Sequence, residues 1–95
     1  MNDRELSASD FTKSIRHSVR ARIMAGHING GADVIALRVF TGLTQEAFSL
    51  ALGISVHTLR NWEQDRRKPE GPALALLRVA ARHPRVLKEN LAAAG

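Results

Sequence analysis

The chain has 95 residues, which is the length of a single domain with room for a short additional segment. Apolar residues make up 44% and charged residues 24%, a balance that is typical of a globular protein and excludes disorder throughout. Lysine and arginine number 14 against 9 acidic residues, a formal net charge of +5. A small basic chain of this kind favours a polyanionic partner, most often nucleic acid.

The composition also bears on the compartment. There is no cysteine, which excludes a disulfide framework and a thiolate zinc site and suits a reducing compartment. No apolar run reaches the ~18 residues that a membrane span needs. Cationic residues interrupt the N-terminal region, which argues against a secretory signal. We therefore predict a cytoplasmic protein without membrane contact.

The sequence offers no chemistry for catalysis. His17, His27 and His83 have no partner at metal-ligand spacing, so we predict no metal site. We find no nucleophile with its base, no paired carboxylates, no P-loop and no dinucleotide fingerprint. We therefore expect neither an enzyme nor a cofactor nor a small-molecule substrate.

Residues 1–30 are predicted to form a helical arm, separate from a domain over residues 31–95. The arm carries apolar residues at intervals of four, which places them on one helix face, and a glycine-rich linker over residues 26–31 follows it. A single helix cannot bury its own apolar face. We therefore predict that this face binds another protein or a second copy of the chain; the alternative is that the arm packs on its own domain. The predicted partner-binding residues are Phe11, Ile15, Val19 and Ile23.

After the linker, the chain is predicted to be entirely helical, since apolar residues recur at helical spacings and no segment alternates as a strand does. Asp33 is predicted to cap a helix that ends near Gly42. Thr44 is predicted to cap the next helix, and Gly53 lies just past its end.

The remaining helices follow the same logic. Ser55 is predicted to cap a helix that runs to about Gln64. Pro72 is well placed as the first residue of a further helix, and Pro84 separates that helix from a short last segment over residues 85–91.

Residues 44–62 carry the pattern of a helix-turn-helix. Gly53 supplies a residue that tolerates a left-handed backbone in the tight turn. Leu59 and Trp62 lie three apart on one face of the second helix and are predicted to point inward. In this motif the second helix enters the major groove of DNA and the first crosses the backbone.

The outward face of that second helix is predicted to read DNA. Arg60 suits guanine and Asn61 suits adenine, each by two parallel hydrogen bonds, and a thymine methyl can contact Val56. The start of the preceding helix and the three cations after the second helix are predicted to contact phosphates. The predicted DNA-binding residues are Gln45, Ser55, Val56, His57, Thr58, Arg60, Asn61, Arg66, Arg67 and Lys68.

The sequence resembles the HigA-type antitoxins of the phage-repressor-like (Xre) helix-turn-helix class. The resemblance lies in Val34-Ile-Ala-Leu-Arg-Val-Phe-Thr-Gly-Leu-Thr-Gln-Glu-Ala-Phe, in Leu-Gly-Ile-Ser-Val-His-Thr-Leu-Arg-Asn-Trp-Glu-Gln-Asp-Arg-Arg-Lys-Pro-Glu-Gly-Pro-Ala, and in the later Leu-Leu-Arg-Val and His83-Pro84. It implies an all-α, phage-repressor-like bundle of about five helices with an N-terminal helical arm. The family usually has glycine where Asp65 stands, and we expect this carboxylate to weaken the phosphate contacts slightly.

The resemblance also implies partners. Members of this family usually act as homodimers, bind a palindromic operator in double-stranded DNA at their own promoter, and neutralise a RelE/HigB-like mRNA-interferase toxin. Segments outside the helix-turn-helix usually bind the toxin in this family, so the resemblance implies that the apolar face of the arm contacts the toxin or the dimer partner. Two other readings remain open: a stand-alone Xre-family regulator without a toxin, and a protein-interaction or RNA-binding module with the same fold. We predict that the dimer surface lies on the last two helical segments, through Leu76, Val79, Val86, Leu87 or Leu91.

Overall fold

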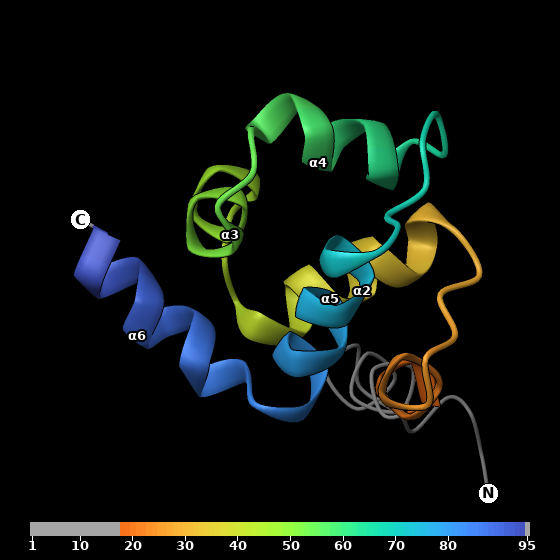
Figure 1. Ribbon diagram of the computed structural model, residues 1–95, viewed down its shortest axis with the longest axis horizontal. Helices are drawn as coiled ribbons and strands as arrows, with labels where there is room; N and C mark the ends of the chain where they lie inside the picture. Colours follow the sequence, from red (N-terminus) through yellow and green to blue (C-terminus); the bar gives the residue numbers. More distant parts are fainter. Residues whose placement is uncertain (1–17, 95) are drawn as a thin grey trace, which may run out of the picture.

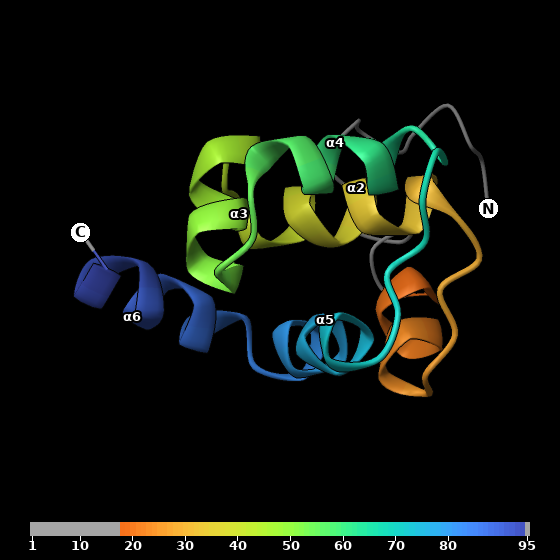
Figure 2. The ribbon, with the colours of Figure 1, turned by 45° about the horizontal axis from the view of Figure 1, so that its top comes forward.

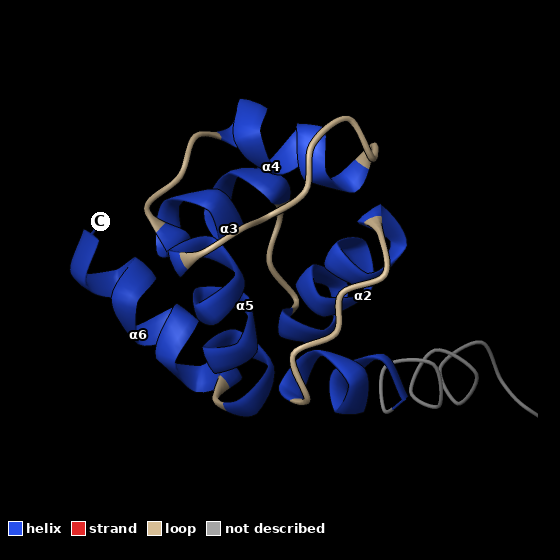
Figure 3. Cartoon of the chain, turned by 45° about the vertical axis from the view of Figure 1, so that its right-hand side comes forward, coloured by secondary structure: helices blue, strands red, loops and turns tan. Residues whose placement is uncertain are grey.

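The computed structural model describes residues 18–94, which form a set of packed helices (Figure 1). The helices are the segment 18–24, α2 (Gly31–Thr41), α3 (Gln45–Leu52), α4 (Val56–Glu63), α5 (Pro72–Arg82) and α6 (Pro84–Ala94). No strand occurs in residues 18–94 (Figure 3), and the predicted all-α class is confirmed. Within this range no helix has the length and apolar character to cross a membrane.

The helices lie in two layers (Figure 2). One layer contains α2, α3 and α4, and the other contains the segment 18–24, α5 and α6. Helix α6 contacts both α3 and α5, and so it joins the layers. Phe48 of α3, Leu59 of α4 and Leu77 of α5 are fully buried, which places one apolar core between the two layers.

Most of the predicted helix ends are confirmed. The Thr44 hydroxyl accepts the Ala47 N–H at 3.1 Å, so Thr44 caps α3. Gly42 and Gly53 end α2 and α3 in the left-handed conformation, with φ of 77° and 75°. Pro72 is the first residue of α5, where its missing N–H has no helical partner to lose.

The start of α2 differs from the prediction. The helix begins at Gly31, so Asp33 lies inside the first turn and is not the capping residue. Its carboxylate is buried, accepts the Asn29 N–H at 2.7 Å and pairs with the Arg22 guanidinium. A carboxylate is favourable at a helix N-terminus, and this one also fastens the linker and the N-terminal helix to α2.

The N-terminal helix completes the core of the chain. Val19 is 6% exposed and Ile23 is 0% exposed, and both belong to the same apolar cluster as the residues of α2 to α6. The partner-binding prediction is therefore wrong for Val19 and Ile23, because the domain itself already covers this face. The alternative, that the arm packs on its own domain, holds for these two residues. Phe11 and Ile15 lie outside the described residues.

Two arginines hold the N-terminal helix against the end of α5. The Arg20 guanidinium donates to the carbonyls of Ala81 and Arg82, and Arg82 donates to the Met24 carbonyl at 3.0 Å. The same Arg20 group lies 5.0 Å from the centroid of the Phe40 ring. Cationic donors are favourable at the carbonyl end of a helix, and here each of two helices receives one from the other.

The last helix is longer than predicted. Helix α6 runs from Pro84 to Ala94, whereas the expected segment covered residues 85–91. Leu87 is 5% exposed and packs into the core, so its predicted role in a dimer surface is wrong. The Asn90 side chain donates to the Ala51 carbonyl, which fixes α6 to the end of α3.

Gly31 marks a close backbone approach between α2 and α4. A Cβ built at this position would lie 2.2 Å from the Glu63 carbonyl oxygen and 2.6 Å from that of Trp62. Backbone atoms cannot give way as a flexible side chain can. Only glycine therefore lets the start of α2 reach the end of α4.

We predict that Gly31→Ala lowers the free energy of unfolding by about 3 kcal/mol, the upper end of what overpacking costs. The matched control is Gly53→Ala, which faces open space and bears only the left-handed backbone penalty of about 1–2 kcal/mol. Urea unfolding of both variants measures the difference. A smaller loss for Gly31→Ala than for Gly53→Ala would contradict the close approach.

Candidate nucleic-acid interface

Helices α3 and α4 meet at a tight turn, and their facing sides are apolar. Leu59 is fully buried and Trp62 is 6% exposed, so the prediction that both point inward is confirmed. Ile54, just after the turn, packs against the core from its edge. Ser49 is buried, and its hydroxyl donates to the Glu46 carbonyl, which satisfies the group without a partner from α4. This packing fixes which face of α4 points outward.

The outward face of α4 presents the predicted reading residues together. His57 and Arg60 are exposed, and Val56 and Asn61 are partly exposed. These four side chains come from one short helix at the edge of the molecule (Figure 1). The face therefore offers an imidazole, a guanidinium and an amide beside a small apolar group, a mixture that suits base edges.

Ser55 and Thr58 serve the start of α4. The Ser55 hydroxyl accepts the Thr58 N–H at 3.0 Å, so Ser55 caps the helix as predicted. The Ser55 hydroxyl also donates a hydrogen bond to the Thr58 hydroxyl, with 3.0 Å between the two oxygens. Because the two hydroxyls hold each other, their first role in the structure is to fix the N-terminal tip of the helix.

A buried carboxylate joins the three helices of the layer formed by α2, α3 and α4. The Glu63 side chain, 5% exposed, accepts from Arg38 of α2 at 2.7 Å and from the Gln45 amide of α3 at 2.8 Å. Charged groups are buried only when they are paired and hydrogen-bonded, and Glu63 meets both conditions. Neither Glu63 nor Arg38 is among the site residues predicted from the sequence. The available signal was that Glu63 lies four residues after Leu59, on the inward face of α4.

The same network extends to the outward face. The Arg60 Nε donates to the Gln45 side-chain oxygen at 3.1 Å, and its Nη2 lies 3.2 Å from a carboxylate oxygen of Glu46. Gln45 therefore links the buried Glu63 to the exposed Arg60. Its amide cannot rotate without breaking one of these hydrogen bonds, so the position of Arg60 is set from the interior.

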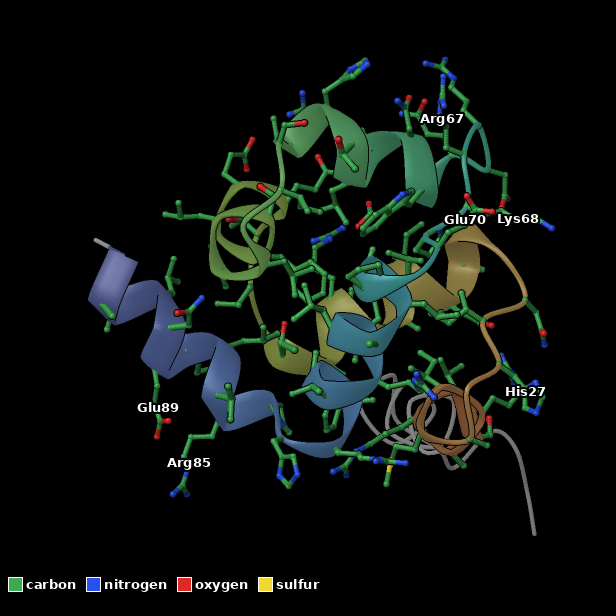
Figure 4. The ribbon with its side chains drawn as sticks, in the orientation of Figure 1. His27, Arg67, Lys68, Glu70, Arg85 and Glu89 are labelled. Carbon is green, nitrogen blue, oxygen red and sulfur yellow. The ribbon has the colours of Figure 1, made fainter. Side chains whose placement is uncertain are left out.

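The three predicted cations after α4 lie in an exposed loop. Arg66, Arg67 and Lys68 are all exposed, and Figure 4 shows Arg67 and Lys68 pointing away from the molecule beyond the end of α4. The N–H groups of Arg66 and Arg67 both donate to the Asn61 carbonyl, at 2.9 and 3.3 Å. We name residues 66–68 the basic loop.

A shallow hollow connects the reading face with the basic loop. It is lined by His57, Thr58, Asn61, Trp62 and Arg67. The structure thus brings Arg67 beside three of the predicted DNA-binding residues, His57, Thr58 and Asn61. Among residues 18–94 no three histidine, aspartate or glutamate side chains gather at metal-binding distance.

Comparisons with known proteins agree with this geometry. Residues 36–79 match the helix-turn-helix family, a range that contains α3, the turn, α4 and the basic loop. Over 63 residues the chain is 36% identical to a protein of Vibrio cholerae serotype O1 named Antitoxin HigA-2, a match that covers 65% of this chain and 61% of that protein. Over 57 residues it is 35% identical to an uncharacterised HTH-type transcriptional regulator of Escherichia coli strain K12, YiaG, covering 60% of this chain and 59% of that protein.

The chain therefore spans about six tenths of the length of each of these relatives. No solved structure matches the chain at a comparable level of significance. The similarity is thus one of sequence, and it centres on the two helices and the turn described above.

We predict that Arg38→Met lowers the free energy of unfolding by about 3 kcal/mol, because it leaves the buried Glu63 carboxylate without its cation. The control is the double variant Arg38→Met with Glu63→Leu, which removes both charges and should recover part of that loss. Urea unfolding measures both. A loss below about 1 kcal/mol for Arg38→Met would mean that the pair behaves as an ordinary surface ion pair.

Proposed function

Since the chain belongs to the phage-repressor-like (Xre) helix-turn-helix family, we propose that it binds operator DNA as a transcriptional repressor and acts as an antitoxin. The observation that carries the DNA-binding part is the burial of Leu59 and Trp62. It leaves the polar face of α4 outward, on the second helix of the motif. Such a helix is about as wide as the ~12 Å major groove.

In this proposal, bases are recognised by the outward face of α4. Asn61 pairs with adenine and Arg60 with guanine, each through two hydrogen bonds, while His57 and Val56 contact neighbouring base edges. Arg60 reaches the groove from the position that Gln45 and Glu46 give it. Because an oriented side chain loses less freedom on binding, this network favours a defined contact.

Phosphates are contacted from two sides of the reading helix. Gln45 is the first residue of α3, where backbone N–H groups and the helix dipole favour an anion. The basic loop contributes three exposed cations on the other side. Ser55 and Thr58 lie at the N-terminal tip of α4.

We expect a dimer, because one headpiece offers few contacts and two copies read half-sites about one helical turn, ~34 Å, apart. Leu76 and Val79 of α5 and Val86 of α6 remain 42 to 45% exposed, and they are the residues we propose for the dimer contact. Sedimentation equilibrium of Val79→Asp against the wild-type chain tests this surface; an unchanged dimer would contradict it.

The antitoxin part of the proposal is supported by the similarity to the protein named HigA-2. The second candidate is a stand-alone regulator without a toxin, and the similarity to the regulator named YiaG supports it. One observation distinguishes the antitoxin from the stand-alone regulator. If the chain is an antitoxin, we expect a gene for a small basic RelE-like protein beside its own gene; if it is a stand-alone regulator, we expect none.

We predict that Asn61→Ala weakens binding to the DNA upstream of the chain's own gene by about 1–3 kcal/mol and relaxes the base preference at one position. A mobility-shift titration over single-base variants of that DNA measures both effects. The control is Glu89→Gln, since Glu89 lies on α6 and points away from the proposed interface (Figure 4). Wild-type affinity and preference in Asn61→Ala would place the reading face elsewhere.

The proposed toxin contact is tested by removing residues 1–17, which include Phe11 and Ile15. A longer deletion is unsuitable because it removes Val19 and Ile23 from the core. We expect the shortened chain to bind operator DNA as before and to lose capture of the co-expressed neighbouring RelE-like protein. Full capture by the shortened chain would exclude these residues from the contact.

A further inference from the structure

Asp65 stands immediately before the basic loop in an unusual backbone conformation. Its φ is +60°, and it is the only non-glycine residue with positive φ in the part of the chain that the structure describes. The left-handed region is disfavoured for residues with a Cβ, although aspartate tolerates it better than most. Such a conformation persists where contacts of the surrounding structure compensate its cost.

The compensation is a hydrogen bond to α2. Asp65 Oδ1 accepts the backbone N–H of Gly31, the first residue of that helix, at 2.7 Å. The first N–H groups of a helix lack partners within it and attract negative charge. Asp65 thus satisfies the start of α2 from a position 34 residues away along the chain.

Two glycines make this contact possible. At Gly31 a Cβ would collide with the Glu63 carbonyl oxygen, and at Gly30 a Cβ would lie 3.2 Å from Asp65 Oδ1. Their lack of side chains lets the linker approach the end of α4. Only then is the short side chain of Asp65 long enough to reach the helix.

The hydrogen bond secures one side of the basic loop. The loop is already fixed to α4, through the two N–H groups that donate to the Asn61 carbonyl. Between the loop and the linker lies a cleft, whose walls include Ile28, Trp62 and Leu74. Because that cleft separates part of the loop from the linker, side-chain packing does not join the two there. The hydrogen bond from Gly31 to Asp65 attaches the loop to α2 instead.

We propose that Asp65 is a positioning residue, which holds the basic loop in place for phosphate contact by tying it to α2; the inference rests on the proposed DNA binding. The carboxylate is directed at the N-terminus of α2. Asp65 therefore raises DNA affinity by holding Arg66, Arg67 and Lys68 in place. This gain is larger than the loss caused by repulsion between its carboxylate and the phosphates. This reverses the expectation that Asp65 weakens those contacts.

Three variants separate placement from charge. Asp65→Asn removes the charge but keeps an oxygen acceptor and a residue that tolerates the left-handed backbone. Asp65→Gly suits the backbone even better but loses the acceptor. Glu70→Gln is the control for charge alone, because Glu70 is an exposed carboxylate close to the basic loop (Figure 4).

The measurement is the dissociation constant on a mixed-sequence duplex, followed as a function of salt concentration. We expect Asp65→Gly to weaken binding about fivefold and to lower the salt slope by about one, the value of one lost phosphate contact. Asp65→Asn should stay within about twofold of the wild-type chain with its slope kept. Glu70→Gln should bind as tightly as the wild-type chain or more tightly.

A stability measurement accompanies the titration. Circular dichroism selects a temperature at which every variant is fully folded, and hydrogen exchange of the Gly31 amide reports the lost hydrogen bond directly. Faster exchange at Gly31 together with a lower slope in Asp65→Gly supports the positioning role. Wild-type affinity and slope in that variant, or equal losses in Asp65→Gly and Asp65→Asn, would overturn it.

The outcome for Asp65 is separate from the outcome for the proposed function. Absence of DNA binding by the wild-type chain would overturn both. Binding by the wild-type chain with no change in Asp65→Gly would overturn only the positioning role.

Discussion

The buried carboxylate of Glu63 is the interaction on which the arrangement of α2, α3 and α4 depends. It takes a guanidinium from α2 and an amide from α3, so each of the two helices is fixed to α4 by a directional contact as well as by apolar packing. An unpaired carboxylate at this depth is strongly unfavourable, which disfavours any arrangement that separates these partners. The outward direction of the reading face follows from that requirement together with the burial of Leu59 and Trp62.

The interior and the surface of this motif are connected through one side chain. The Gln45 side-chain oxygen accepts a hydrogen bond from Arg60, and the Gln45 amide donates one to Glu63. The exposed Arg60 guanidinium is therefore oriented through Gln45 by the buried Glu63 carboxylate. On the opposite side, Asp65 connects the basic loop to the start of α2. The proposed DNA surface is thus held at both edges by polar contacts that lead back to α2.

The features that the sequence predicts correctly are local ones, and the contacts that it does not predict join segments far apart along the chain. Thr44, Ser55, Gly53 and Pro72 act within one turn of their own helix, and their residue types specify that action. The inward position of Leu59 and Trp62 followed from helical spacing alone. Spacing cannot say which neighbour covers an apolar side chain, so it predicts a partner contact for Val19, Ile23 and Leu87 although the chain buries them itself. The same limit applies to Asp33. Its residue type suits a helix cap, whereas its ion pair with Arg22 depends on where the N-terminal helix docks.

The arginines that fasten helices to one another also shape the charge that a polyanion meets. Besides Arg60, which pairs with Glu46 on the reading face, four guanidinium groups within residues 18–94 are engaged with carbonyls or carboxylates of the same chain: Arg20, Arg22, Arg38 and Arg82. Each contributes to the net positive count, yet its donors are directed at its own fold. The cations of the basic loop, by contrast, project into solvent at one end of α4 (Figure 4). A long-range electrostatic field depends on where charges sit as well as on their sum, so the exposed cations of the basic loop act on a polyanion more directly than arginines that are paired inside the fold.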